Sequence, residues 1–167
     1  MTERLTLILG GARSGKTRHA ESLIKALPAP WIYVATAEIW DEEMRERVER
    51  HKADRSEAGW ITVEAPLDLA AALQTDHPIL VDCLTLWVTN LMLGERDIDA
   101  ATERLEAALH ARKAPTILVA NEVGLGIVPD NKMARDFRDH AGRLHQRLAA
   151  QASEVILMVA GLPLAVK

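Results

Sequence analysis

Short apolar runs alternate with longer amphipathic stretches along this 167-residue chain. The apolar runs predict buried strands at residues 5–9, 31–35, 60–64, 79–82, 116–120 and 155–159. The stretches between them have helical spacing and predict helices at residues 16–27, 40–55, 66–73, 84–93, 98–111 and 131–152. Strands that alternate with helices indicate an α/β fold, with a mostly parallel central sheet and helices on both faces. Only a short tail is expected after residue 159.

The first predicted strand runs directly into Gly10-Gly11-Ala12-Arg13-Ser14-Gly15-Lys16-Thr17, which has the spacing of a P-loop. Its glycines let backbone N–H groups approach phosphate oxygens without an intervening side chain. Lys16 would reach the β- and γ-phosphates, and the Thr17 hydroxyl would ligate Mg²⁺. The N-terminus of the following helix adds the positive end of a helix dipole. The sequence therefore predicts a P-loop NTPase fold that binds a nucleoside triphosphate.

Ligands in such sheets gather at the C-terminal ends of the strands. Residues 10–17, 35–38, 82 and 121–122 are therefore expected to be neighbours. Asp82 ends a predicted strand and is the candidate carboxylate for Mg²⁺. Two alternatives remain for this site. Asp82 could instead cap the helix that begins at Leu84, and Glu122, which follows another strand, could take the metal role.

His51 is the candidate nucleophile. It shares one face of the predicted helix with Trp40, Met44 and Val48 and lies in a basic cluster formed by Arg47, Arg50, Lys52 and Arg55. Histidine can carry a phosphoryl or nucleotidyl group on a ring nitrogen, and a basic cluster suits a polyphosphate. The alternative is that His51 is simply a packed or solvated side chain.

The loop at residues 121–129 is apolar where loops are normally polar. Val123, Leu125, Ile127 and Val128 stand between glycines, so either a partner subunit or a large ligand covers them, or the loop is a buried crossover. The arginines of the next helix, Arg135, Arg138, Arg143 and Arg147, predict a solvated or subunit-facing basic stripe.

Composition limits the possible partners. The chain length fits one domain over residues 1–167, and a net charge of −4 gives no general attraction to nucleic acid. No apolar run approaches the roughly 18 residues of a membrane span, and no signal pattern precedes the first strand. The one cysteine, Cys83, suits a reducing compartment. We expect a cytoplasmic protein with no nucleic-acid partner and no membrane span.

Together these segments resemble the adenosylcobinamide kinase / adenosylcobinamide-phosphate guanylyltransferase family of cobalamin biosynthesis, over nearly the whole chain. The P-loop is shared by many families, whereas the His51 segment and Asn121-Glu-Val-Gly-Leu-Gly-Ile-Val-Pro129 are far more specific. The matching segments are residues 10–17, 34–37, 51–55, 60–64, 121–131, 134–139 and 160–164.

The resemblance implies a bifunctional enzyme with a RecA-like fold. It would phosphorylate adenosylcobinamide with ATP or GTP, then transfer GMP from GTP to that phosphate, releasing pyrophosphate and giving adenosylcobinamide-GDP. His51 matches the family histidine that carries GMP covalently. The family's nucleotide contacts map onto residues 10–17 and onto Ala35, Thr36, Ala37, Lys52, Ala53, Asp54, Arg55, Glu64 and Asp82. The resemblance also implies a homotrimer, with the loop at residues 123–128 contacting the corrinoid or a neighbouring subunit.

Two other functions are compatible with a P-loop. The chain could be a different small-molecule kinase, in which His51 only contacts phosphate. It could also be a nucleotide-dependent switch, but the guanine-reading pattern Asn-Lys-x-Asp is missing: Asn131-Lys-Met-Ala134 lacks the aspartate and opens a helix.

Overall fold

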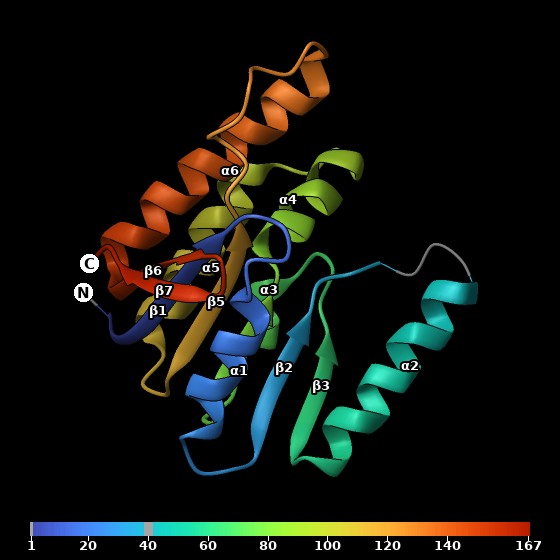
Figure 1. Cartoon of the computed structure of the whole chain (residues 1–167), viewed down its shortest axis with the longest axis vertical. Helices are drawn as coiled ribbons and strands as arrows, with labels where there is room; N and C mark the ends of the chain where they lie inside the picture. The colour runs from blue at the N-terminus through green and yellow to red at the C-terminus, as the bar shows by residue number, and fades with distance from the viewer. Residues whose placement is uncertain (1, 39–41) are drawn as a thin grey trace.

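The computed structural model describes residues 2–38 and 42–167, and the side chains of residues 2, 3, 43, 44, 47, 50, 51 and 54 lie outside that description. Within the described residues, the strands form one seven-stranded sheet in the order β3-β2-β4-β5-β1-β6-β7 (Figure 1). All neighbouring pairs in this sheet are parallel except β6 and β7. The strands are β1 (Thr2–Gly10), β2 (Trp31–Ala35), β3 (Trp60–Glu64), β4 (Ile79–Asp82), β5 (Thr116–Asn121), β6 (Ala152–Val159) and β7 (Leu162–Ala165).

Helices cover both faces of the sheet, as the sequence predicts, but unequally. They are α1 (Lys16–Lys25), α2 (Glu42–Glu57), α3 (Leu69–Ala72), α4 (Leu84–Leu93), α5 (Ile98–Ala111) and α6 (Lys132–Gln151). One face packs against α3, α4, α5 and α6 and holds the larger core, with side chains such as Leu7, Val81 and Leu118. The other face packs against α1, through Ala20 and Ile24.

Helix α2 stands at the β3 edge of the sheet (Figure 1). None of its described side chains is buried, because the helix is dominated by charged residues. The predicted helix start at Trp40 lies outside the described residues, and so does the side chain of His51. The inward orientation expected for His51 therefore stays a prediction.

The prediction of a short tail after residue 159 is wrong. Residues 162–165 form β7, which pairs antiparallel with β6 and closes a hairpin at the edge of the sheet. Ala160 and Gly161 both have positive φ, at 51° and 81°, which gives the chain a tight reversal. The observed helix α3 is also shorter than the helix predicted at 66–73. The Asp68 side chain accepts a hydrogen bond from the Ala71 N–H and caps this helix, which therefore begins at Leu69.

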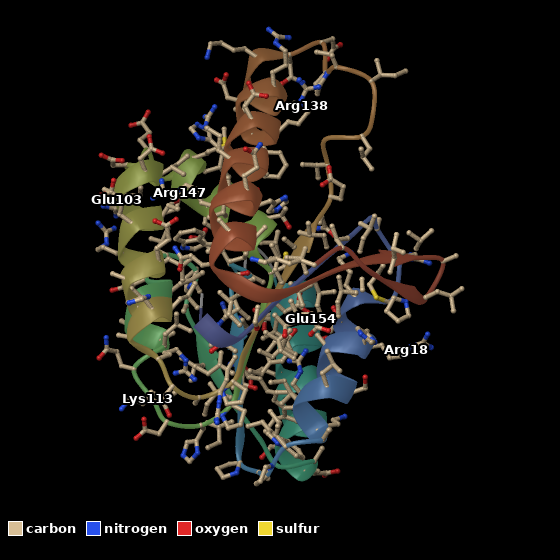
Figure 2. All side chains as sticks on the ribbon, turned by 90° about the vertical axis from the view of Figure 1, so that its left-hand side faces the viewer. Arg18, Glu103, Lys113, Arg138, Arg147 and Glu154 are labelled. Carbon is tan, nitrogen blue, oxygen red and sulfur yellow. The ribbon has the colours of Figure 1, made fainter. Side chains whose placement is uncertain are left out.

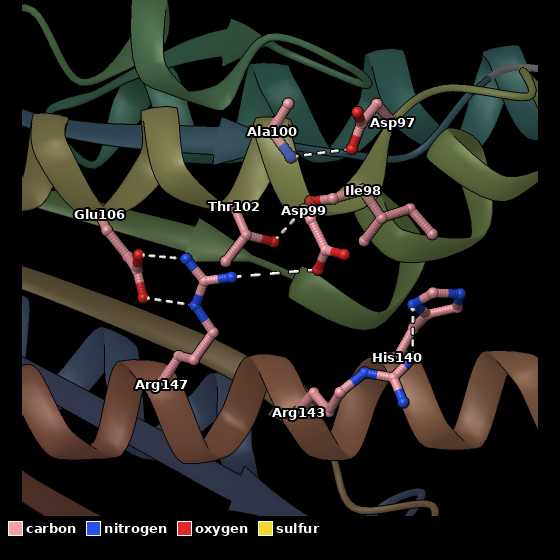
Figure 3. Close-up of polar contacts among 9 residues, drawn as sticks. All are labelled: Asp97, Ile98, Asp99, Ala100, Thr102, Glu106, His140, Arg143 and Arg147. Atoms are coloured by element: carbon pink, nitrogen blue, oxygen red, sulfur yellow. Dashed lines mark hydrogen bonds and ion pairs between the residues drawn. The ribbon is translucent and has the colours of Figure 1, made fainter.

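All four arginines of the predicted basic stripe on α6 contact groups of this chain: Arg138 and Arg143 contact Asp139 and His140 on the same helix, and the other two reach beyond it. Arg147 forms a bidentate pair with Glu106 of α5, with Nε and Nη2 donating at 2.8 and 2.5 Å (Figure 3). Arg135 donates to the carbonyl oxygens of Pro129 and Asp130 and so holds the end of the loop before α6. These side chains join elements of one subunit. No helix in the described part of the chain is long and apolar enough to cross a membrane.

Candidate functional site

The loop at residues 10–17 turns tightly between β1 and α1, and two glycines are required by its geometry. A Cβ on Gly10 would lie 2.6 Å from Ser14 Oγ and 2.9 Å from the carbonyl oxygen of Met158. Gly15 precedes α1 with φ at 92°, a conformation that side chains with a Cβ disfavour. The Gly161 N–H donates to the Ser14 carbonyl at 3.0 Å, so the β6–β7 hairpin supports the loop from outside.

A pocket of about 540 Å³ opens over this loop, large enough for a nucleotide. Residues 13–18 line it, together with Ala160 and Gly161 of the β6–β7 turn. Figure 2 shows Arg18 on the first turn of α1, close to that hairpin. The sequence did not predict this side of the pocket, because only a short tail was expected after residue 159.

Lys16 lies inside the loop. Its ammonium group donates to the Gly11 carbonyl at 2.6 Å and lies 3.5 Å from Ser14 Oγ. Burial lowers the pKa of Lys16, and the nearby carboxylate of Asp82 partly opposes that shift. The ammonium group is thus held inside the loop, on the groups that would surround a bound phosphate.

Asp82 ends β4 beside the loop, as predicted. The Thr17 hydroxyl donates to Asp82 Oδ2 at 2.9 Å, so the two predicted magnesium residues are in direct contact. A hydroxyl and a carboxylate are hard oxygen donors of the kind that Mg²⁺ uses alongside phosphates, so the residues present fit this ion. The alternative that Asp82 caps α4 is wrong: the capping residue is Cys83, and no side-chain hydrogen bond caps this helix.

Tyr33, which sequence reasoning missed, also belongs to this site. Its hydroxyl donates to Asp82 Oδ2 at 2.8 Å, and burial, reinforced by the Asp82 charge, raises the pKa of Tyr33 far above its usual range. The phenol is therefore protonated and acts as a donor. The sequence alone carries no signal for this contact, because it depends on the register of two strands: Tyr33 pairs with Leu80, and Asp82 lies two residues further along β4 on the same face.

Thr36 follows β2 and is fully buried. Its hydroxyl accepts from the Cys83 N–H and donates to the Cys83 carbonyl, both at 2.8 Å. The Asn90 side chain donates to the carbonyl oxygens of Thr36 and Pro66, at 2.7 and 2.9 Å. The Thr36 hydroxyl therefore already bonds the backbone N–H and carbonyl of Cys83. A nucleotide contact in this segment would come from the half-buried Ala35 and Ala37 or from the backbone.

Helix α2 reaches the site through two described side chains. The Arg55 guanidinium carbon lies 3.5 Å from the centroid of the Tyr33 ring, and Lys52 forms ion pairs with Glu64 and Glu49. The hydrogen bond to Glu64 is the main reason that the pKa of Lys52 is raised. Two of the predicted nucleotide contacts, Lys52 and Glu64, are therefore in contact with each other. Arg55 packs on the ring of Tyr33, and the hydroxyl of Tyr33 bonds Asp82. Ala53 is exposed, and the side chains of His51 and Asp54 lie outside the described residues.

The end of β5 adjoins the loop from the other side, so all four predicted strand ends are neighbours. The Glu122 N–H donates to the Gly10 carbonyl at 3.0 Å, and the Thr36 N–H donates to the Asp82 carbonyl at 3.3 Å. The Glu122 carboxylate accepts from the Gly124 N–H, whereas it is Asp82 that contacts Thr17. The geometry thus favours Asp82 over Glu122 as the metal carboxylate.

The apolar loop before α6 is not a buried crossover, so that alternative is wrong. Leu125, Ile127 and Val128 are 86, 97 and 60% exposed. Side chains of this size leave a large apolar surface in contact with water. The loop can be covered by something outside this chain, as the other alternative requires.

The fold and the site define an α/β protein with a phosphate-binding loop motif and a paired hydroxyl and carboxylate at the C-terminal edge of its sheet. The chain belongs to the cobinamide kinase / cobinamide phosphate guanyltransferase family, whose model matches residues 6–166. This confirms the resemblance found in the sequence.

Three relatives match over nearly their full length. The bifunctional adenosylcobalamin biosynthesis protein CobU of Salmonella typhimurium is 45% identical, covering 98% of this chain and 99% of the relative. CobP of Pseudomonas aeruginosa, also named a bifunctional adenosylcobalamin biosynthesis protein, is 46% identical over 96% of each chain. CobU of Escherichia coli, with the same name, is 42% identical over 98% of this chain and 99% of the relative.

Proposed function

We propose that this chain is a bifunctional enzyme of cobalamin biosynthesis, built on a RecA-like P-loop NTPase fold. It phosphorylates adenosylcobinamide with ATP or GTP and then transfers GMP from GTP to that phosphate, giving adenosylcobinamide-GDP and pyrophosphate. The observation that carries this proposal is the contact between Thr17 and Asp82 beside the phosphate-binding loop, in a chain whose family membership spans residues 6–166.

The first reaction transfers the γ-phosphoryl group to the hydroxyl of adenosylcobinamide. The loop N–H groups and Lys16 hold the triphosphate, so that positioning and charge neutralisation supply most of the rate enhancement. Thr17 and Asp82 would hold Mg²⁺, which supplies further neutralisation of phosphate charge when bound. The hydroxyl oxygen forms the new bond to the γ-phosphorus, the bond to the nucleoside diphosphate breaks, and the hydroxyl proton is released.

The second reaction opens the triphosphate at its α-phosphorus. A ring nitrogen of neutral His51 forms a bond to that phosphorus and pyrophosphate leaves. The phosphate of adenosylcobinamide phosphate then attacks the same phosphorus, the bond to His51 breaks, and adenosylcobinamide-GDP is released. Support comes from the position of His51 on α2, one helical turn before Arg55, which packs on a residue bound to Asp82.

The experiment that tests this proposal uses GTP labelled at the α- or the γ-phosphorus, with Mg²⁺ and adenosylcobinamide. We expect an acid-labile α-label on the protein, no γ-label, and loss of the α-label in His51→Ala. His110→Ala, at an exposed position on α5, is the matched control and should label normally. Because the attacking imidazole must be neutral, labelling should decrease below about pH 6.5. A label that persists in His51→Ala, or a rate that is flat down to about pH 5, contradicts the role of His51.

The same experiment separates the two alternatives. A P-loop kinase without guanylyl transfer would phosphorylate adenosylcobinamide and leave no α-label on the protein. A nucleotide-dependent switch would bind GTP without turning over adenosylcobinamide at all.

We further propose that the enzyme is a cytoplasmic homotrimer. The support for an assembly is the exposed apolar loop at residues 123–128, which would contact the corrinoid or a neighbouring subunit. Sedimentation of the wild-type chain and of Ile127→Asp tests this, since a charge at a subunit contact should shift the chain toward monomer.

A further inference from the structure

Tyr33 lies between the carboxylate of Asp82 and the guanidinium of Arg55. We propose that Tyr33 is a positioning residue with two functions: its hydroxyl fixes the orientation of the Asp82 carboxylate, and its ring holds α2, the helix that carries His51. This inference rests on the proposed function, because it assigns Asp82 to the Mg²⁺ site used in both reactions and His51 to guanylyl transfer alone.

The hydroxyl of Tyr33 acts on one oxygen of Asp82. Asp82 Oδ2 accepts from Tyr33 at 2.8 Å and from Thr17 at 2.9 Å. Two donors on the same oxygen, one from β2 and one from α1, restrict rotation of the carboxylate about its terminal torsion. Tyr33 lies on a buried strand and is 5% exposed, so its donor has a fixed position. Asp82 is therefore oriented by the protein before any metal binds.

The ring of Tyr33 acts on α2. Arg55 lies over its face at 3.5 Å, within the range of a cation–π interaction. Trp60 meets the same ring nearly edge-on, with centroids 6.0 Å apart and planes at 82°, and Trp31 packs on Trp60 at 5.4 Å. The platform under Arg55 is thus part of a rigid aromatic cluster on β2 and β3.

Helix α2 depends on this platform because its other described contacts are weak. None of its described side chains is buried, and the ion pair of Lys52 with Glu64 is partly exposed to solvent.

The test separates the hydroxyl from the ring. Tyr33→Phe removes the donor to Asp82 and keeps the ring under Arg55, whereas Tyr33→Leu removes both. Trp31→Phe is the control, because it alters the same cluster at a residue that pairs with Trp60 and bonds the Leu27 carbonyl. Three quantities are measured for each protein: the Mg²⁺ concentration at half-maximal GTP binding, by calorimetry; the rate of adenosylcobinamide phosphorylation; and the rate of α-label transfer to the protein. Thermal unfolding is followed in parallel.

For Tyr33→Phe we expect the Mg²⁺ midpoint to rise by about tenfold, the equivalent of one charge-assisted hydrogen bond. The ratio of guanylylation to phosphorylation should stay unchanged, because α2 keeps its platform. Tyr33→Leu should show the same shift in the Mg²⁺ midpoint. In addition, its ratio of guanylylation to phosphorylation should decrease by about fivefold. Trp31→Phe should leave both quantities at their wild-type values.

An unchanged Mg²⁺ midpoint in Tyr33→Phe, with normal labelling of the wild-type protein, overturns the role of Tyr33 and leaves the proposed function standing. The same holds if both variants lose the two activities in proportion to a lowered Tm, since that is the signature of a structural residue. A wild-type protein that takes up no α-label refutes the proposed guanylyl transfer, and with it the coupling of α2 to that reaction.

Discussion

Replacing Thr36 by valine should destabilise this protein more than any exchange of similar size on its surface. Valine has nearly the shape of threonine but no hydroxyl, so Thr36→Val deletes both hydrogen bonds to Cys83. The buried Cys83 N–H loses this partner, whereas the Cys83 carbonyl keeps the hydrogen bond from the Trp87 N–H at 3.3 Å. The N–H left without this bond costs about 1–3 kcal/mol and the second lost bond about 1 kcal/mol, so we expect the free energy of unfolding to decrease by about 3 kcal/mol. For a chain of this size the Tm should decrease by about 6–12 °C.

Urea unfolding followed by tryptophan fluorescence measures this loss, with two matched variants beside it. Thr36→Ser keeps the hydroxyl and should recover most of the stability, losing about 1 kcal/mol for one buried methyl group. Thr89→Val removes a hydroxyl that bonds only the Thr85 carbonyl within α4, and its cost should be under about 1 kcal/mol. The reasoning is refuted if Thr36→Val is as stable as Thr89→Val, or if Thr36→Ser is no better than Thr36→Val.

Two further predictions concern buried ionisable groups. Lys16→Met should lower both reaction rates by at least about 100-fold, because a preorganised charge on the phosphates is lost. The free energy of unfolding by urea should stay within about 1 kcal/mol of wild type. A loss of stability large enough to account for the lower rates would contradict this role of Lys16. Burial lowers the pKa of His145, against the opposing charge of Glu122, so folding favours the neutral ring. The stability this contributes is complete above the unfolded pKa of about 6.5 and is lost as pH falls below it. In urea unfolding, His145→Leu should flatten that pH dependence; equal slopes in variant and wild type would refute it.

The apolar pattern predicts most of the fold because a buried parallel strand has few alternatives. The bounds of β2, β3, β4, α4 and α5 agree with the sequence prediction. In β4, the three residues before Asp82 are apolar and all three are buried. β7 was missed for the opposite reason. Its side chains are exposed, so its only signal was the turn at Ala160 and Gly161.

The candidate site was predictable where chemistry depends on residue type and spacing, and not where it depends on register. Lys16, Thr17 and Asp82 follow from the loop motif and from the rule that parallel strands end at one edge. Tyr33 could not be identified in the same way, because its role requires knowing that β2 lies beside β4 in a register that pairs it with Leu80. For Thr36 the sequence offered a nucleotide contact, and only the three-dimensional arrangement reveals that its hydroxyl bonds the Cys83 peptide.

The way in which α2 is attached is consistent with one site that serves the two proposed reactions. The loop, Thr17 and Asp82 rest on buried strands and α1, which favours the proposed role in which they hold the triphosphate in the same way in both reactions. The helix that carries His51 lies at the sheet edge with no described side chain buried, and elements with so few buried contacts have low local stability. A nucleophile held permanently against the α-phosphorus would obstruct the acceptor in the first reaction. We propose that placing His51 on a weakly attached helix, anchored through Arg55 and Tyr33, lets it approach for the second proposed reaction without altering the phosphate-binding loop.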